Sequence, residues 1–410
     1  MSKKIQVLVL SSSMLVIVFA LIGGLGVHAS SGGNSKDSVY NHIEVYSEVL
    51  HRVRSEYVEE PNISVVTSGA LHGLLESLDA DSSYLSPAEY KAFKLTKADG
   101  KAGIGATVSK RFGYAAVVAV VPGGPADKAG INAGDILETV NGKSTHDLSL
   151  AAVKTELAGD VGSRLEAVVI RTRKIEPQKI TIVREIVNPP AVTEQMLADS
   201  TGYIKAPALT KGKAQEIANK IKSLQAKGAK KLVLDLRYSS EGNAEEGVAV
   251  ANLFLGKGLI GTLQGQKYEK ATYNADPQKK ITDLPLAVLV NRGTFGAAEI
   301  VASAVLDNQR GDVVGDKTFG EGSVQKLIEV PDGSALILSV AKFYTPNGKV
   351  IQDTGITPNI LVAANDDLAA VITDEDNDGV PDEPQKTPPK EDDQLKRAID
   401  VLKAKTQPKS

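Results

Sequence analysis

Cysteine and tryptophan are absent from this sequence of 410 residues, and histidine occurs only five times. The lack of cysteine excludes a disulfide framework and a thiolate metal site, and it leaves the redox compartment undecided. The last histidine is His146, so the long carboxyl-terminal part of the chain has neither a thiol nor an imidazole. A Cys–His or Ser–His catalytic pair is therefore hard to assemble there.

A strong excess of charge of one sign is also missing. The formal net charge is only −3, which gives no argument for nucleic acid as a partner. Hydrophobic residues make up 42% of the chain, enough for a core in each of two or three domains. No internal repeat stands out.

The long apolar run of the sequence lies at the amino terminus. Lys3 and Lys4 precede about 23 uncharged residues, which as a helix rising about 1.5 Å per residue would span the roughly 30 Å hydrocarbon layer. Residues 1–36 are therefore expected to be a membrane anchor or signal segment and a linker, and cleavage after residues 27–29 remains open. Lysines before the run place the remainder outside the cytoplasm.

A glycine-rich strand start and a long loop motif mark residues 98–187. GIGATV begins at Gly103, and the pattern P-A-x-x-A-G-x-x-x-G-D-x-I/L-x-x-V-N-G runs from Pro125 to Gly142. This pattern resembles a PDZ domain, which implies that backbone N–H groups bind a terminal carboxylate and that a strand edge takes an extended peptide. The expected peptide-binding residues are Gly103, Ile104, Gly105 and Ala106. Alternatively, the module only packs against its neighbour.

A strand, a tight turn and a helix follow one another near residue 290. Leu284–Val290 is a short apolar run typical of a buried strand, Gly293 and Gly296 form a turn, and Ala297–Leu306 favours a helix. Several hydrolase folds present a reactive side chain in this way, because the turn lifts one residue clear of the sheet and points helix-terminal N–H groups at the substrate.

The stretch from Asn291 to Gln325 resembles the carboxyl-terminal processing peptidases, also called tail-specific proteases. The family motif reads roughly N-x-G-S-A-S-A-S-E-I, a helix, D-x-x-R-A and V-x-G-x-x-T-F-G-K-G-x-V-Q, and it is in register here over about 35 residues. The resemblance implies a Ser/Lys catalytic dyad, but the nucleophile position holds Gly296 and the base position holds Glu321. Gln325 is retained.

The resemblance extends to other segments between about residues 38 and 365. Ser77–Phe93 matches the family's S-L-D-P-H-S-S-Y-L lead-in, with Ala80 and Asp81 in place of Pro and His. In the family, L-D-L-R-N-N-P-G-G presents backbone N–H groups to the oxyanion; here Glu241 replaces the first loop glycine and Gly242 remains.

The predicted architecture is α/β. The resemblance implies a ClpP/crotonase-like core of sheet and helices, joined to a β-rich PDZ-like module and an amino-terminal helical segment. The expected domains are a helical region at 37–97, the PDZ-like domain at 98–187, the core at 188–365, an acidic and proline-rich linker at 366–390, and a carboxyl-terminal helix at 391–410.

Acidic side chains at alternate positions and a glycine make part of the linker similar to a calcium-binding loop, although the twelfth position holds Gln385. The candidate calcium ligands are Asp374, Asp376, Asp378 and Asp382. A plain solvated linker is the alternative, and no other cofactor is expected.

Two functions remain open. In the first, the chain is an impaired homologue that binds polypeptide tails or unfolded proteins and acts as a scaffold or regulator. In the second, it is an endopeptidase that uses an atypical nucleophile such as Thr294, or a water molecule activated by Glu321. The missing serine, the missing lysine and the altered oxyanion loop favour the first; the sequence does not predict the oligomeric state.

Overall fold

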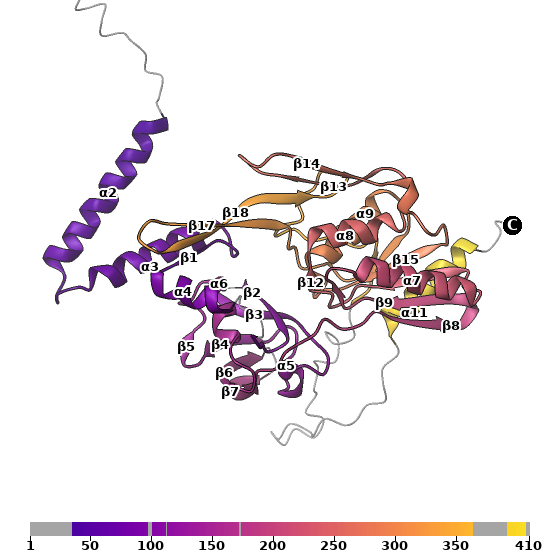
Figure 1. Cartoon of the computed structure of the whole chain (residues 1–410), viewed down its shortest axis with the longest axis horizontal. Coiled ribbons are helices and arrows are strands. Elements are labelled where there is room, and N and C mark those ends of the chain that lie inside the picture. The colour runs from indigo at the N-terminus through magenta and orange to yellow at the C-terminus, as the bar shows by residue number, and fades with distance from the viewer. Residues whose placement is uncertain (1–34, 97–100, 112, 172–173, 364–391, 407–410) are drawn as a thin grey trace, which may run out of the picture. The chain divides into compact units, whose positions relative to one another are not determined.

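The computed structural model describes residues 35–96, 101–111, 113–171, 174–363 and 392–406 (Figure 1). By internal contacts the chain divides into two units, residues 1–68 and 69–410. Within the described ranges no helix is long and apolar enough to cross a membrane. The apolar amino-terminal run lies outside them, as do the candidate calcium ligands Asp374, Asp376, Asp378 and Asp382.

The first unit contains α2 (Ser35–Glu56) and the beginning of α3 (Ile63–Glu76). Exposed Arg52 pairs with Glu48 and Glu56 at 2.8 and 2.9 Å, the i,i+4 spacing that stabilises a solvated helix.

An antiparallel sheet forms the PDZ-like module of the second unit. Its strand order is β2-β3-β4-β6-β7, with β5 paired to β4. Apolar side chains from alternate strand positions pack with helix α6 to make its core. The bounds are β2 Ala106–Arg111, β3 Tyr114–Val120, α5 Pro125–Lys128, β4 Ile136–Val140, β5 Lys143–Ser144, α6 Leu150–Leu157, β6 Arg164–Arg171 and β7 Lys174–Val183.

A second sheet forms the centre of the core, in the order β19-β16-β15-β11-β9-β8. All its pairs are parallel except β8 with β9. The bounds are β8 Thr193–Leu197, β9 Thr201–Lys205, β11 Lys231–Asp235, β15 Leu286–Val290, β16 Asp312–Gly315 and β19 Ile360–Leu361.

Helices cover both faces of this sheet, so the middle residues of β11 and β15 are apolar on both faces. Leu234 and Val288 point to one face, where α7 (Lys213–Ala226), α8 (Ala244–Asn252) and α9 (Ala297–Asp307) pack. Val233 and Leu289 point to the other face and contact α11 (Asp393–Thr406, yellow in Figure 1). The mixed α/β architecture predicted from the sequence is confirmed.

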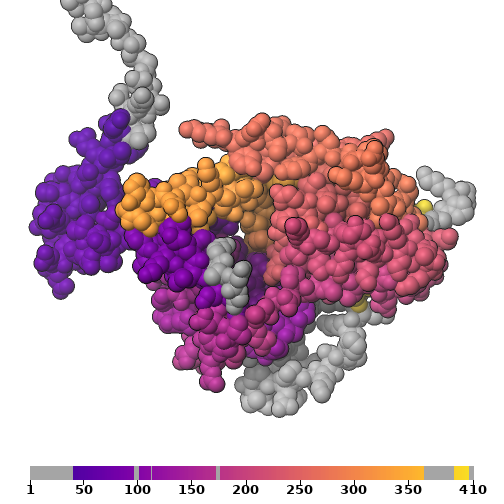
Figure 2. All heavy atoms as spheres, viewed as in Figure 1, coloured from indigo at the N-terminus to yellow at the C-terminus, as the bar shows by residue number. Residues whose placement is uncertain are grey.

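A third sheet runs beside the core in the order β1-β18-β13-β14, with β17 also paired to β18. Its strands β17 and β18 (orange in Figure 2) lie against the violet residues around β1 and α4 (Pro87–Thr96). Because β1 pairs with β18, the segment near residue 80 lies next to the start of β17. The bounds are β1 Ser83–Leu85, β13 Leu259–Gln264, β14 Ala271–Asn274, β17 Ser323–Glu329 and β18 Ala335–Tyr344.

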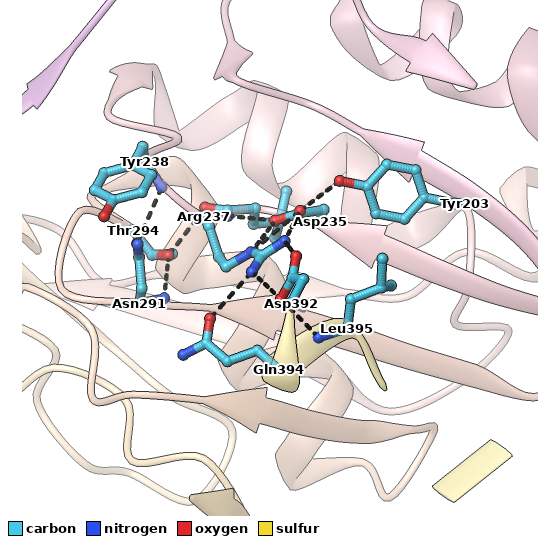
Figure 3. Close-up of polar contacts among 10 residues, drawn as sticks. Tyr203, Asp235, Arg237, Tyr238, Asn291, Thr294, Asp392, Gln394 and Leu395 are labelled. Atoms are coloured by element: carbon cyan, nitrogen blue, oxygen red, sulfur yellow. Dashed lines mark hydrogen bonds and ion pairs between the residues drawn. The ribbon is translucent and has the colours of Figure 1, made fainter. Parts of the chain in front are cut away.

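The apolar segment that begins at Lys231 is a strand only as far as Asp235. Tyr238 has a positive φ of 58°, which a strand cannot contain. Arg237 instead turns toward α11 and donates hydrogen bonds to Asp235, Asp392 and Gln394 (Figure 3). The end of the strand thereby becomes a clamp for the carboxyl-terminal helix.

Candidate functional site

The turn between β15 and α9 is built by hydrogen bonds from its own side chains. The Asn291 side-chain oxygen accepts hydrogen bonds from the amides of Gly293 and Tyr238, both at 3.0 Å. The Thr294 hydroxyl donates to the Leu236 carbonyl at 2.9 Å and accepts from the Asn291 amide at 3.0 Å. Thr294 is fully buried, so its hydroxyl is engaged in holding the turn and is closed to a substrate.

Gly296 lies directly before α9, with φ 56° and ψ −112°. This conformation is strained for residues with a side chain, and such strain collects at reactive turns. A Cβ built on Gly296 would meet only one heavy atom within 4 Å, the Cγ of Glu321 at 4.0 Å. The structure therefore brings positions 296 and 321 face to face and leaves room for a side chain at 296.

The carboxylate of Glu299 holds these two positions together. It is completely buried and accepts hydrogen bonds from the amides of Gly296, Gly320 and Glu321 at 3.0, 2.8 and 2.7 Å, and from the Thr318 hydroxyl. Burial raises the pKa of Glu299 to about 7, and these hydrogen bonds oppose the shift. Glu299 ties the loop before β17 to the first turn of α9.

Glu321 lies in an acidic and poorly solvated environment. Burial, followed by the negative charge of Asp81, raises the pKa of Glu321 to about 8, while the positive charge of Lys154 opposes the shift. At neutral pH the side chain is mostly protonated. It can donate a hydrogen bond, but it supplies neither a neutral amine nor a nucleophile.

Asp81 and Ser323 complete the surroundings of Glu321. The Ser323 hydroxyl donates to Asp81 at 3.1 Å, lies 3.5 Å from a Glu321 oxygen and accepts from the Gln325 side-chain amide at 2.7 Å. Burial raises the pKa of Asp81, which is 9% exposed. Gln325 is exposed and reaches Glu321 only through Ser323.

Gly242 lies against the first residue of α9. A Cβ at Gly242 would be 2.5 Å from the Leu209 carbonyl oxygen and 3.1 Å from the Ala297 Cβ, so no side chain fits there. The short pair of β12 (Glu241–Gly242) with β10 (Ala208–Leu209) fixes this loop beside the amino-terminal end of α9. Such a position suits backbone N–H groups that stabilise an oxyanion.

A groove of about 440 Å³ lies between β2 and α6 of the PDZ-like module. All four expected peptide-binding residues line it: Gly103, Ile104, Gly105 and Ala106. The Gly103 amide already donates to the Glu185 carbonyl at 3.0 Å. Within the described chain, the amides of Ile104 and Gly105 donate to no acceptor, which leaves them open to a terminal carboxylate.

Two contacts join this module to the core. The hydroxyls of Thr107 on β2 and Ser240 of the oxyanion-type loop are 2.8 Å apart. Arg111 at the end of β2 stacks on the Phe319 ring, 4.7 Å from its centroid. Glu241, which follows Ser240 in the chain, lines the groove together with Lys154 of α6. The groove and positions 296 and 321 are therefore built from adjacent segments.

The structure thus groups Gly296, Glu321 and Gly242 around the start of α9, and places Gln325 one side chain away. Sequence reasoning did not identify Glu299, Lys154 or Gln352, whose amide links Asp81 to the Gly322 amide. Glu299 could have been found from the sequence, because its carboxylate is in register with the Glu of the family motif. No sequence pattern indicates a role for Lys154 or Gln352. Within the described residues no group of three or more acidic or histidine side chains could hold a metal.

Models of two known protein families match parts of this chain. A model of peptidase family S41 matches residues 200–362, and a PDZ domain model matches residues 117–171. A carboxy-terminal-processing protease of Bartonella bacilliformis is 32% identical over 334 residues, covering 80% of this chain and 77% of that protein.

Two further proteins agree with this match. The carboxy-terminal processing protease CtpA of Bacillus subtilis is 31% identical over 354 residues, covering 86% of this chain and 74% of that protein. The solved structure of a photosystem II D1 C-terminal processing protease superposes with a TM-score of 0.65 at 26% identity, covering 78% of this chain and 92% of that one.

Proposed function

The chain belongs to the carboxyl-terminal processing proteases of peptidase family S41, and we propose that it binds polypeptide tails without cleaving them. It acts as a scaffold or regulator in the compartment outside the cytoplasm. Binding uses the groove between β2 and α6, in which the amides of Ile104 and Gly105 receive the terminal carboxylate.

One observation carries the proposed loss of cleavage. Position 296 has the strained turn geometry and the free space that a nucleophile requires, but glycine has no atom that can attack a carbonyl. The facing residue is an acid whose pKa is raised to about 8, instead of a lysine that could accept a proton. Both halves of a covalent dyad are therefore absent in this proposal, and Glu241 stands where the family's oxyanion loop has its first glycine.

The second candidate is an endopeptidase that activates water. Glu321 favours it, because a carboxyl with a pKa of about 8 is matched to proton transfer at mildly alkaline pH. Thr294 gives no support to an endopeptidase with an atypical nucleophile, because its hydroxyl is buried and already makes two hydrogen bonds. In this candidate, cleavage would rise as Glu321 loses its proton.

Binding and cleavage can be measured on the same full-length protein. A labelled peptide with a small or apolar last residue is offered with a free carboxylate and, as the control, with an amidated terminus. We expect the free acid to bind much more tightly and an unfolded protein substrate to remain intact over the same period. Equal affinity for both peptides would remove the tail-binding proposal, and cleavage abolished by Glu321→Gln would favour the second candidate.

A further inference from the structure

Glu241 is an unusual component of a peptide groove. Among the described residues that line the groove, it alone comes from the core region at 188–365. No described side chain or amide donates a hydrogen bond to its carboxylate, and no described lysine or arginine pairs with it. Burial raises the pKa of Glu241. Lys101 and Lys154 also line the groove, but neither forms an ion pair with this carboxylate, and Lys101 pairs with Asp160.

The position of Glu241 along the groove follows from its neighbour. Ser240 contacts the Thr107 hydroxyl at 2.8 Å, so this loop lies on the face of β2 to which Thr107 points. Ala106 and Val108 point instead into the core of the PDZ-like module, toward α6. An extended tail beside β2 has the same alternation, with successive side chains on opposite faces.

This alternation separates the side chains of a bound tail into two groups. With the carboxylate at the amides of Ile104 and Gly105, the last side chain enters the apolar part of the groove, where Leu157 and Val187 lie. The second and fourth residues from the end then project toward the Thr107 face. Their side chains pass the carboxylate of Glu241.

We propose that Glu241 is a specificity-determining residue that selects tails with lysine or arginine at the second or fourth position from the carboxyl terminus. The inference rests on the proposed tail binding and names the class of tail. A cation there replaces the water that Glu241 has lost and pairs with a carboxylate that otherwise has no partner. An acidic residue at the same place meets like charge.

The test compares short labelled peptides that differ at one position. Each has a free carboxylate and an apolar last residue, with lysine, alanine or glutamate second or fourth from the end, and binding to the full-length protein is measured by fluorescence anisotropy. We expect lysine to bind about tenfold more tightly than glutamate at one of these positions. The Glu241→Gln variant should reduce that ratio to about twofold or less, and Glu241→Lys should reverse it.

The matched control is Glu245→Gln, which removes the same charge from an exposed residue in the first turn of α8. It should keep the full preference for lysine. Equal affinities for lysine and glutamate peptides, or a preference that survives Glu241→Gln, would overturn the role of Glu241 while leaving tail binding intact. Failure of every free-acid peptide to bind would overturn tail binding and this inference together.

Discussion

Gly296 keeps a backbone conformation that costs about 1–3 kcal/mol for most residues with a side chain. Glycine adopts it freely, so the turn forms here at little cost in conformational energy. The facing residue, Glu321, is acidic and lies near Asp81 and Ser323, at the position where the family resemblance implies a lysine. In the proposed tail-binding function, this site keeps the geometry of the turn and performs no covalent attack.

Glu299 should be a major contributor to the stability of this site. Glu299→Ala removes the acceptor of three amide hydrogen bonds in a fully buried place, so the free energy of unfolding should fall by about 2–4 kcal/mol. Urea denaturation measures the change. Exposed Glu245→Ala is the control, with an expected change within about 0.5 kcal/mol; a similar small change for Glu299→Ala would show that its hydrogen bonds are dispensable.

The raised pKa of Glu321 predicts a pH dependence of stability. Between its ordinary value of 4.5 and about 8, the folded protein keeps a proton that the unfolded chain releases. The contribution of Glu321 is therefore full below the ordinary value and is lost as pH rises toward 8, at up to about 1.4 kcal/mol per pH unit.

Glu321→Gln should flatten this dependence, because glutamine resembles the protonated acid at every pH. Denaturation of both proteins at a series of pH values gives the difference directly. A wild-type protein whose stability relative to Glu321→Gln stays constant from pH 5 to pH 8 would show that Glu321 is ionised in the fold.

The carboxyl-terminal helix α11 depends on two kinds of contact. Ala398 and Leu402 are fully buried against the sheet, and Asp392 both pairs with Arg237 at 2.7 Å and accepts a hydrogen bond from the Leu395 amide at 2.9 Å. The second contact is a helix cap. Figure 3 shows how both meet at the end of β11.

Removing this cap should loosen α11 selectively. Asp392→Ala is expected to lower the free energy of opening for α11 by about 1–2 kcal/mol, seen as faster amide hydrogen exchange in residues 393–406. Asp393→Ala, an exposed neighbour in the first turn, should change exchange little. Equal acceleration in both variants would mean that the Arg237 clamp does not hold the helix.

Elements with a strong local pattern were predictable from the sequence. The apolar run of β15, the glycine turn and the alanine-rich α9 follow one another without a gap, and the structure has them within two residues of the expected bounds. Strands β13, β14 and β8 were missed. β13 depends on antiparallel pairing with the distant β18, so local pattern does not reveal it.

The same limit applies to the site. The family resemblance assigned the nucleophile and base positions to residues 296 and 321, and in the structure a Cβ at 296 would lie 4.0 Å from the Cγ of Glu321. The approach of Asp81 to Ser323 joins residues 242 apart in sequence, and it follows from the pairing of β1 with β18. No local sequence pattern indicates that contact. Nor does any pattern indicate that Lys154, an exposed residue of α6, opposes the rise in the pKa of Glu321.

For the whole molecule, the apolar run near the amino terminus predicts attachment to a membrane or export across it. The full-length protein should fractionate with membranes or appear outside the cytoplasm. In cells whose outer barrier has been made permeable, added protease should digest the part of the protein that follows the apolar run. Recovery of the intact full-length chain in the cytosol would contradict this prediction.

The most direct test of the account restores the missing dyad. Gly296→Ser combined with Glu321→Lys provides a hydroxyl and an amine on positions whose facing side-chain atoms would start about 4.0 Å apart. Incubation with an unfolded protein should give cleavage by the double variant, and none by the wild-type protein or by either single variant, because each lacks the nucleophile, the base or both. Cleavage by the wild-type protein that Glu321→Gln abolishes would contradict the account.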